Sequence, residues 1–525
     1  MERAFDAIVI GSGFGGGVTA CRLAEAGWSV AVLERGRRFA RTDFPDRAAA
    51  VPRMLWHPQL NPRGLFELRL FGDLAVLTGV GVGGGSLIYA SVEVRPDADA
   101  FASHWPLGTD SKALDRYFGA VEEALDVRPV PDPAPRKVHA FARAARLAGA
   151  EAERVPLAVH FGAARDNPFG GRRQEGCTNL GRCMTGCPRH AKNTIDLTYL
   201  ARAEANGASV LPLHEVHELR APRTRAGLWR VGFKDHETGR RGRVDALVVI
   251  LAAGALGSTR LLLRNRGRLP HLSKALGTRF SANGNALGAV FGATQPGTTQ
   301  ARVEFGPSIT SRYRPPGANG FMIEDLGLPL GAMGLLEAVR GAQRLPEPWR
   351  SLVRVKRLAA RARVSDRSIA HVEASGVATA GPGYDDALFM LLVGRDRAPG
   401  RMRVLRPFGT FDVSFSRRDE QPLFDRMATA ISDLAGAVGG TGALSADIGP
   451  LGLFLTAHPL GGCPMSHDRD DGVVDPFGRV HGYEDSLRVL DGSIVPAALG
   501  SNPSLTIAAL AERGVEQLIA SGEPQ

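Results

Sequence analysis

Long apolar runs are absent from the 525-residue sequence, which has no stretch of about eighteen consecutive apolar residues. We therefore expect no transmembrane helix. We also expect no secretory signal peptide, because only residues 1–5 precede an apolar run that reads as the first strand of a domain. These absences predict a cytoplasmic protein, with peripheral contact as the one form of membrane association left open.

Cysteine is scarce, and its five copies argue against a disulfide framework. Three lie close together, at Cys177, Cys183 and Cys187. With His190 or a distant cysteine as the fourth ligand they could bind zinc or an iron–sulfur cluster, although their spacing matches no common ferredoxin pattern. A local disulfide or redox pair is a second interpretation. We favour a third, in which the thiols are simply packed, and we predict no metal.

Lysine is nearly absent, so arginine supplies almost all of the net charge of +10. An arginine-biased composition explains this charge, and no helix-turn-helix, zinc-finger or RNA-binding pattern accompanies it. We expect no nucleic-acid partner. The basic segment 346–368 could form an amphipathic helix on anionic lipid. A solvated helix is the favoured interpretation of that segment.

Glycine, by contrast, is abundant near the start, in "GSGFGGGVTACRLAEAG". We expect a strand over residues 5–10, a helix over 18–26 and a second strand over 28–33 that ends in Glu34. Gly11 permits a tight turn, Gly13 lets the backbone approach a pyrophosphate, and Gly16 lets helix and strand pack closely. Glu34 lies where an acid accepts hydrogen bonds from a ribose. This arrangement predicts a bound dinucleotide, NAD or FAD.

Three later stretches have related features. "LTGVGVGGGSLIYASV" has glycines that press a backbone against a flat or charged group. "VDALVVILAAGALGSTRLLLR" reads as a buried strand, a turn and a helix from about Ser258. "LRVLDGSIVPAALGSNPSLTIAALAERG" reads as a strand delivering Asp491, a loop, and a helix from about Ser504. A further helix is expected from Thr194 or Asp196 to Gly207.

These stretches, with "HPLGGC" and "GRVHGY", occur in the order found in the glucose–methanol–choline (GMC) oxidoreductase family, and the chain most closely resembles its cholesterol oxidase branch. The resemblance implies an α/β fold in which FAD binds across a discontinuous Rossmann-like domain. A substrate or cap domain, built on a mixed sheet with helices, is interleaved with it. The expected FAD domain comprises residues 1–38, 194–286 and 471–525, and the cap domain residues 39–193 and 287–470.

The resemblance also implies contacts along the cofactor. Gly11, Gly13 and Gly16 are expected to bind the pyrophosphate, Glu34 the ribose and Val216 the adenine. The loop of Gly83, Gly84, Gly85 and Ser86 is expected along the isoalloxazine ring and Asp491 at the ribityl chain. Asn502 and Pro503 are expected at the pyrimidine edge. The dipole of the helix that follows Pro503 would stabilise negative charge on the reduced flavin.

Catalysis is expected at His458 and Asn502, which resemble the two hydroxyl-contacting residues of the family. The implied reaction is oxidation of a bulky apolar alcohol, such as a 3-hydroxysteroid, by hydride transfer to flavin N5, with dioxygen reduced to hydrogen peroxide. Cholesterol oxidases also move a double bond with an acidic side chain. Glu324 in "GFMIEDLG" is the best match for this acid, and Asp325 is the alternative.

The sequence departs from the cholesterol oxidase pattern at three positions. Tyr89 and Ala90 stand where those enzymes have asparagine and glycine, and Ser504 stands where they have a phenylalanine. The acceptor and substrate can therefore differ. The alternatives are a dehydrogenase with a non-oxygen acceptor, a non-redox flavoprotein such as a lyase or isomerase, and a lipid- or nucleic-acid-binding protein.

Overall fold

The computed structural model describes residues 4–44, 54–72, 74–169, 172–224, 227–298, 306–327, 387–405, 409–444 and 454–522. The basic segment 346–368 lies outside these residues, so the lipid-surface helix stays a prediction. Within the described residues, no helix is both long and apolar enough to cross a bilayer.

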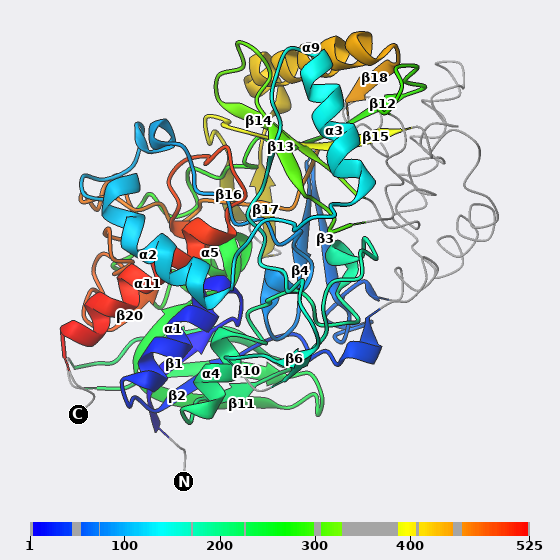
Figure 1. Cartoon of the computed structure of the whole chain (residues 1–525). Helices are drawn as coiled ribbons and strands as arrows, with labels where there is room; N and C mark the ends of the chain where they lie inside the picture. The colour runs from blue at the N-terminus through cyan, green and yellow to red at the C-terminus, as the bar shows by residue number, and fades with distance from the viewer. Residues whose placement is uncertain are drawn as a thin grey trace.

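A seven-stranded sheet contains the amino-terminal strand (Figure 1). Five of its strands run parallel in the order β8-β2-β1-β11-β20, the order typical of a dinucleotide-binding sheet. Their bounds are β1 (Ala4–Ile10), β2 (Val30–Leu33), β8 (Ser209–Leu211), β11 (Arg241–Leu251) and β20 (Leu487–Val489). The first half of β11 pairs antiparallel with β10 (Trp229–Asp235), which pairs with β9 (His214–Arg220). The α/β, Rossmann-like fold class is therefore confirmed.

Helix α1 (Phe14–Glu25) packs against α4 (Tyr199–Ala205) and α11 (Ser504–Ala520), and α2 (Ser111–Ala124) packs on α11 (Figure 1). The expected start of α11 at Ser504 is confirmed. Three other expected starts are wrong. Helix α1 begins at Phe14 instead of residue 18, α5 (Gly254–Asn265) begins at Gly254 instead of residue 258, and α4 begins only at Tyr199.

Close packing explains the early start of α1. A Cβ at Gly15 would lie 1.7 Å from the carbonyl oxygen of Leu490, and one at Gly16 would lie 2.1 Å from that of Gly11. Glycine disfavours a helix by about 1 kcal/mol per residue, but only glycine lets this first turn pack so closely on the neighbouring backbone. The late start of α4 reflects the irregular turn before it, where Leu197 N donates to Thr194 O at 3.0 Å and Leu200 N reaches back five residues to Ile195 O at 2.9 Å, instead of the four-residue spacing of an α-helix.

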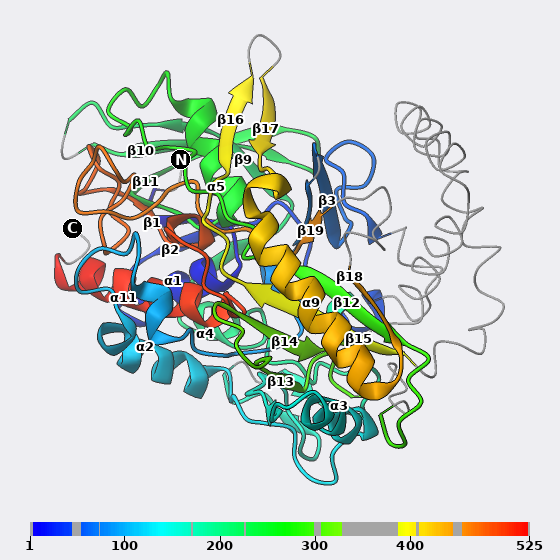
Figure 2. The same cartoon turned by 90° about the horizontal axis from the view of Figure 1, so that it is seen from above.

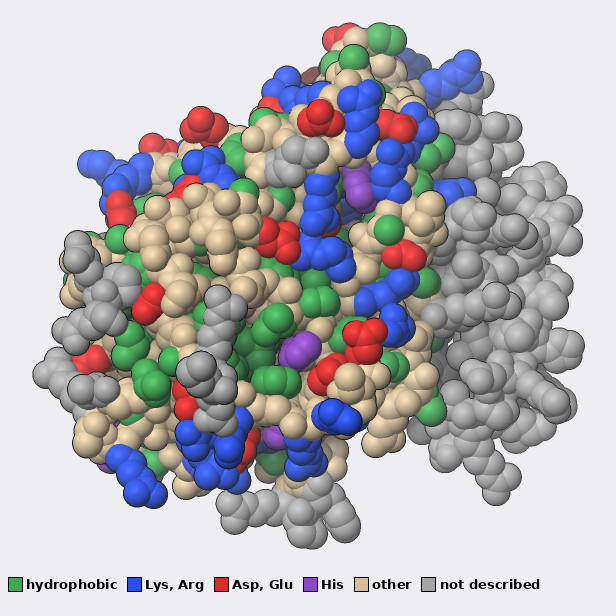
Figure 3. All heavy atoms as spheres, turned by 90° about the horizontal axis from the view of Figure 1, so that it is seen from below, with side chains coloured by type: hydrophobic (Ala, Val, Ile, Leu, Met, Phe, Trp, Pro, Cys, Tyr) green, Lys and Arg blue, Asp and Glu red, His purple; other side chains and the backbone are tan. Residues whose placement is uncertain are grey.

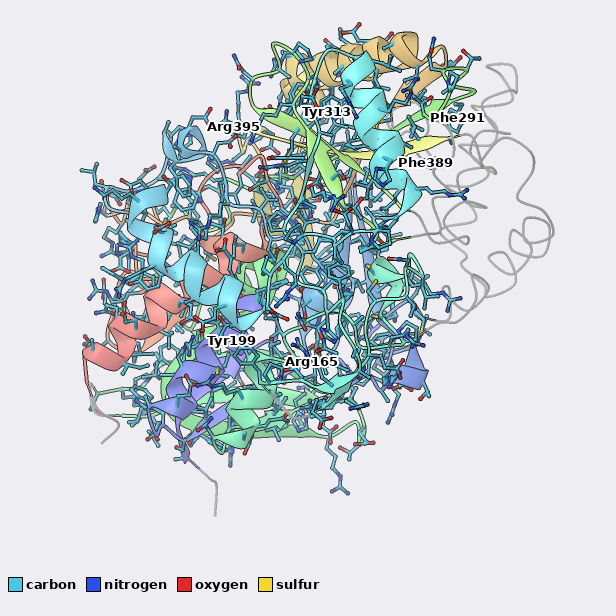
Figure 4. The ribbon with its side chains drawn as sticks, viewed as in Figure 1. Arg165, Tyr199, Phe291, Tyr313, Phe389 and Arg395 are labelled. Carbon is cyan, nitrogen blue, oxygen red and sulfur yellow. The ribbon has the colours of Figure 1, made fainter. Side chains whose placement is uncertain are left out.

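The second large sheet has six strands in the order β18-β12-β15-β14-β13-β5. The strands are β5 (Glu153–Arg154), β12 (Ala286–Phe291), β13 (Ser311–Tyr313), β14 (Phe321–Asp325), β15 (Leu388–Gly394) and β18 (Thr441–Leu444). Helices α3 (Arg136–Leu147) and α9 (Gln421–Val438) cover one face of it (Figure 2). On that face Tyr313 contacts Phe141 of α3 with ring centroids 5.4 Å apart; Phe291 and Phe389 contact one another at 5.9 Å on the opposite face (Figure 4).

A three-stranded sheet is formed by β3 (Phe66–Phe71), β4 (Leu74–Gly79) and β19 (Phe454–Thr456), with β4 between the other two. Strands β4 and β19 run parallel, with Thr456 opposite Val76. Because parallel strands end at the same edge, the glycine loop after β4 and the "HPLGGC" segment after β19 leave the sheet in the same direction. Two hairpins complete the described strands: β16 (Arg401–Leu405) with β17 (Thr410–Ser414), and β6 (Arg165–Asp166) with β7 (Arg173–Gln174).

The arginine excess is largely dispersed. On the face seen from below, Lys and Arg side chains are interspersed with Asp and Glu (Figure 3). Many arginines are held in ion pairs, such as Arg230 with Asp245 at 2.8 Å. The two large sheets take their strands from alternating parts of the chain, and we keep the domain boundaries given above as a proposal.

Candidate functional site

The two glycine-rich loops meet in the structure. A Cβ built at Gly84 would lie 2.6 Å from Gly13 Cα, so the loops contact one another backbone to backbone. Gly83 and Gly84 have positive φ angles of 107° and 55°, which favour glycine. Ser12 links the loops further, because its Oγ lies 3.2 Å from Gly81 O and accepts from Gly83 N at 3.2 Å.

The crowding differs from glycine to glycine. A Cβ at Gly11 would lie 2.3 Å from Ala252 O, so Gly11 is required by the fold itself. A Cβ at Gly13 would meet only Gly84 Cα, at 3.9 Å, and one at Gly85 would meet only a ring atom of Phe14, at 4.0 Å. The protein therefore does not need glycine at Gly13 or Gly85 for its own packing. An open backbone at the amino end of α1 suits a phosphate group.

Glu34 is buried at the end of β2. Its Oε2 accepts from Ser12 N at 3.1 Å and from Ser12 Oγ at 2.7 Å, and its Oε1 accepts from Gly36 N at 2.8 Å. Burial raises the pKa of this carboxyl, and the hydrogen bonds from Gly36 and Ser12 oppose that shift. A carboxylate has four lone-pair sites and three are used here, so Glu34 retains one site for a ribose hydroxyl.

The other expected cofactor residues come from β9, from the turn after β20 and from the glycine loop after β4. Half-buried Val216 lies on β9, two residues after His214, whose N–H donates to Glu34 O at 2.8 Å. Asp491, two residues after β20, accepts from Gly254 N at 2.9 Å and Ser258 Oγ at 2.5 Å through one oxygen, and from Ser493 N at 2.8 Å and Ser493 Oγ at 2.6 Å through the other. Buried Ser86 joins its loop to the turn before α4, because its Oγ accepts from Ile195 N at 3.0 Å.

His458 is held by a residue that sequence reasoning missed. Its Nδ1 lies 3.0 Å and 3.2 Å from the two side-chain polar atoms of Asn285, and its backbone N–H donates to Thr456 Oγ1 at 3.0 Å. With Nδ1 engaged, Nε2 is the nitrogen left for a substrate. The surrounding protein lowers the pKa of His458 to about 4, so the imidazole is neutral at physiological pH and can accept a proton.

A second missed residue, Asn283, ties the histidine to the loop before α11. Its Nδ2 donates to Ser501 O at 2.8 Å, and its Oδ1 accepts from Leu499 N at 2.9 Å. Thr456 Oγ1 donates to Ala282 O at 2.8 Å in the same segment. Residues 281–285 therefore hold both the His458 segment and the segment that leads into Asn502. In the sequence this segment reads "SANGN", and nothing in that pattern distinguishes its two amides from those of an exposed loop.

Asn502 contacts Glu324. Asn502 Nδ2 donates to Glu324 Oε2 at 3.3 Å, whereas Glu324 Oε1 and Asn502 Oδ1 have no hydrogen-bond partner within the described residues. Glu324 is fully buried, and burial raises its pKa to about 8. The site thus contains buried polar atoms that a ligand hydroxyl can satisfy.

Asp325 points the other way, as successive residues of a strand do. It accepts from Thr310 N at 2.7 Å and Ser311 N at 2.6 Å, and it pairs with Lys137 of α3 at 3.0 Å. Its oxygens are therefore used on the helix-covered face of the sheet. Glu324 and Asn285 share the opposite face, because Glu324 alternates with Ile323 and Asn285 with Ala286, which pack toward the helices.

The three clustered cysteines are free thiols, Cys183 buried and the other two half-buried. Cys183 Sγ accepts from Ser308 N at 3.5 Å. In the described part of the chain, no group of three His, Cys, Asp or Glu side chains is placed to hold a metal ion. The packed-thiol interpretation stays a prediction.

The parallel sheet, with its glycine turn at the amino end of α1, defines a dinucleotide-binding protein. Comparisons with known proteins then define the family. Models of the GMC oxidoreductase family match residues 5–278 and 446–511. The chain therefore belongs to the GMC oxidoreductases: it is an FAD-binding oxidoreductase that acts on CH–OH donors.

Named relatives agree with this assignment. The chain is 32% identical to a cholesterol oxidase of Mycobacterium tuberculosis (strain ATCC 25618 / H37Rv), over 100% of this chain and 92% of that one. It is 30% identical to a cholesterol oxidase of Acinetobacter baumannii, over 98% and 94%. The fold matches pyridoxine 4-oxidase from Mesorbium loti with a TM-score of 0.62 and 16% identity, over 99% and 100%.

Proposed function

We propose that this enzyme oxidises the hydroxyl of a bulky apolar alcohol, such as a 3-hydroxysteroid, and passes the electrons to dioxygen. The observation that carries the proposal is the joining of His458 and Asn502 by residues 281–285, beside an acid, Glu324, with an unsatisfied oxygen. The cholesterol oxidase relatives, which match nearly the whole chain, support the steroid class.

Gly11, Gly13 and Gly16 would hold the pyrophosphate of FAD, and Glu34 the ribose. The loop of Gly83, Gly84, Gly85 and Ser86 would follow the isoalloxazine ring, Val216 would contact the adenine, and Asp491 the ribityl chain. Asn502 and Pro503 would lie at the pyrimidine edge. Bound FAD supplies the hydride acceptor and the route of electrons to dioxygen.

The chain's own residues handle the hydroxyl. His458 Nε2 accepts the hydroxyl proton as the alcohol carbon loses its hydride, and Asn285 keeps the imidazole oriented. Asn502 orients the same oxygen through its side-chain amide. A positioned general base contributes about 10²- to 10⁴-fold to the rate of such a step.

Glu324 would move a proton between carbons of the oxidised product and so shift a double bond into conjugation with the new ketone. The step conserves atoms and electrons, because the carboxylate takes a proton from one carbon and returns it to another. Since the pKa of Glu324 is raised to about 8, its carboxylate fraction grows as pH rises toward 8. The fraction of isomerised product should rise over the same range.

The test is an anaerobic substrate panel on the purified flavoprotein. Cholesterol, a long-chain primary alcohol and a small aryl alcohol are each mixed with it, flavin absorbance is followed, and air is then admitted. The proposal predicts bleaching by cholesterol and recovery in air with one hydrogen peroxide per ketone. His458→Ala should slow bleaching while FAD content is unchanged, and His467→Ala, at an exposed histidine, is the matched control.

The other outcomes identify the alternatives. Bleaching without recovery in air would indicate a dehydrogenase with another acceptor. Turnover without net oxidation would indicate a non-redox flavoprotein. A preference for the primary alcohol would indicate a long-chain alcohol as the substrate. The chain is 27% identical to the long-chain-alcohol oxidase FAO4B of Arabidopsis thaliana, over 96% of this chain and 65% of that one.

A further inference from the structure

A second fully buried acid, Glu93, lies outside the catalytic group described above. It follows the glycine loop by eight residues, and its backbone N–H donates to Pro156 O at 3.0 Å. Its Oε2 accepts from Ser504 Oγ at 2.9 Å, and Ser504 Oγ also lies 3.2 Å from Val92 O. Ser504 is the first residue of α11, two residues after Asn502.

The carboxyl of Glu93 is only half satisfied. It is 0% exposed, and its Oε1 has no hydrogen-bond partner among the described residues. Nor does any arginine, lysine or histidine of the described chain form an ion pair with it. A carboxylate buried without a cation is costly, whereas a protonated carboxyl is far less so.

The groups that face Glu93 do not supply positive charge. From α2, Glu122 contributes negative charge, although Arg95 holds Glu122 at 2.7 Å. From its own segment it faces Tyr89, whose hydroxyl donates to Asn193 O at 3.0 Å. Burial raises the pKa of Tyr89, so this side chain is neutral. From α11 it meets the hydroxyl of Ser504. Burial, with a smaller contribution from Glu122, raises the pKa of Glu93 to about 8, and the Ser504 hydrogen bond opposes the shift.

We propose that Glu93 is a positioning residue that acts through Ser504: it anchors the first turn of α11 to the segment after the glycine loop, and it keeps a proton there. A neutral acid leaves the positive end of α11 free to act on the flavin, whereas an ionised one would offset it. The proposal rests on the location of the flavin beside Asn502 and Pro503 given under Proposed function. The proposal also gives a role to Ser504, which stands where the cholesterol oxidases have a phenylalanine.

The test is the pH dependence of the flavin's midpoint reduction potential in the holoenzyme, from about pH 6 to about pH 10. In the wild type we expect the potential to fall more steeply with pH above about 8, because reduction is then coupled to proton uptake by Glu93. Glu93→Gln keeps the size of the side chain but cannot ionise. That variant should lose the break in slope, and at high pH its potential should lie above that of the wild type.

Two further variants complete the test. Ser504→Ala removes the hydrogen bond that stabilises the carboxylate, so the break should move to higher pH. Glu123→Gln, at an exposed acid on α2, should keep the wild-type profile. A break that persists in Glu93→Gln, or that stays at the wild-type pH in Ser504→Ala, overturns the proposal.

The outcomes separate this proposal from the one on which it rests. If the flavin spectrum is the same in Asn502→Ala as in the wild type, the flavin does not lie where the proposed function puts it. If the Asn502→Ala spectrum shifts while Glu93→Gln keeps the wild-type pH profile, only the role of Glu93 is wrong.

Discussion

Replacing Asn285 tests whether its hydrogen bond to Nδ1 orients the imidazole of His458 for catalysis. Asn285 is buried, and its amide is the side-chain partner of His458 Nδ1. Asn285→Ala removes one uncharged hydrogen bond, worth about 0.5–1.5 kcal/mol. At about 1.4 kcal/mol per tenfold, flavin reduction should slow roughly 2- to 12-fold. His458→Ala, which removes the base itself, should cost about 10²- to 10⁴-fold.

Asn285→Asp should give a different signature. A carboxylate at about the same position, close to Nδ1, stabilises the imidazolium and raises the pKa of His458 from about 4. The acid limb of the pH–rate profile should then move to higher pH. Anaerobic stopped-flow bleaching across pH, with kcat and KM separated, measures both effects. A wild-type reduction rate in Asn285→Ala, together with an unmoved acid limb in Asn285→Asp, would refute the role of Asn285.

Three further predictions use matched pairs or pH. Gly13→Ala should fold, because its Cβ meets only one protein atom, at 3.9 Å, but it should bind FAD less tightly. Gly11→Ala, with a Cβ 2.3 Å from a backbone oxygen, should not give folded protein. Circular dichroism and flavin content would show both results. Asp325→Asn leaves the buried Lys137 without its carboxylate and should lower the free energy of unfolding by about 3 kcal/mol, as denaturant melts would measure. Glu324→Gln should leave that free energy unchanged and abolish only the double-bond shift, as product analysis would show. Since the folded-state pKa of His458 lies below its ordinary 6.5, the free energy of unfolding should fall as pH drops from 6.5 to about 4, and a wild-type pH dependence of unfolding in His458→Gln would contradict this.

The sequence could predict those elements whose cause is local. Strand β1, the glycine turn and the start of α11 at Ser504 follow from apolar periodicity and turn chemistry. The early start of α5 at Gly254 does not, because its first N–H donates to Asp491, which lies just after β20 and more than 200 residues away in the sequence. Intrinsic propensity gives no signal for such a contact, and tertiary packing overrides it.

The same distinction applies to the site. His458, Asn502 and Glu324 lie in recognisable motifs, so a resemblance could suggest them. Asn283 and Asn285 act by holding other residues, and nothing in their local pattern separates a supporting amide from an exposed loop amide. They become visible only when the structure shows that both are buried and what they contact.

The unsatisfied oxygens of the site bear on specificity as well as on catalysis. A buried polar atom without a partner costs about 1–3 kcal/mol, and both Glu324 Oε1 and Asn502 Oδ1 are in this position within the described residues. At neutral pH Glu324 is largely protonated, so it can donate a hydrogen bond, whereas Asn502 Oδ1 can only accept one. A substrate hydroxyl can accept a hydrogen bond from the Glu324 carboxyl, and it can donate its one O–H hydrogen to Asn502 Oδ1 or to His458 Nε2, the base that removes it in the proposed reaction. A ketone can only accept, and a hydrocarbon does neither. The site should therefore hold the alcohol more tightly than the ketone it becomes, which favours product release after each turnover.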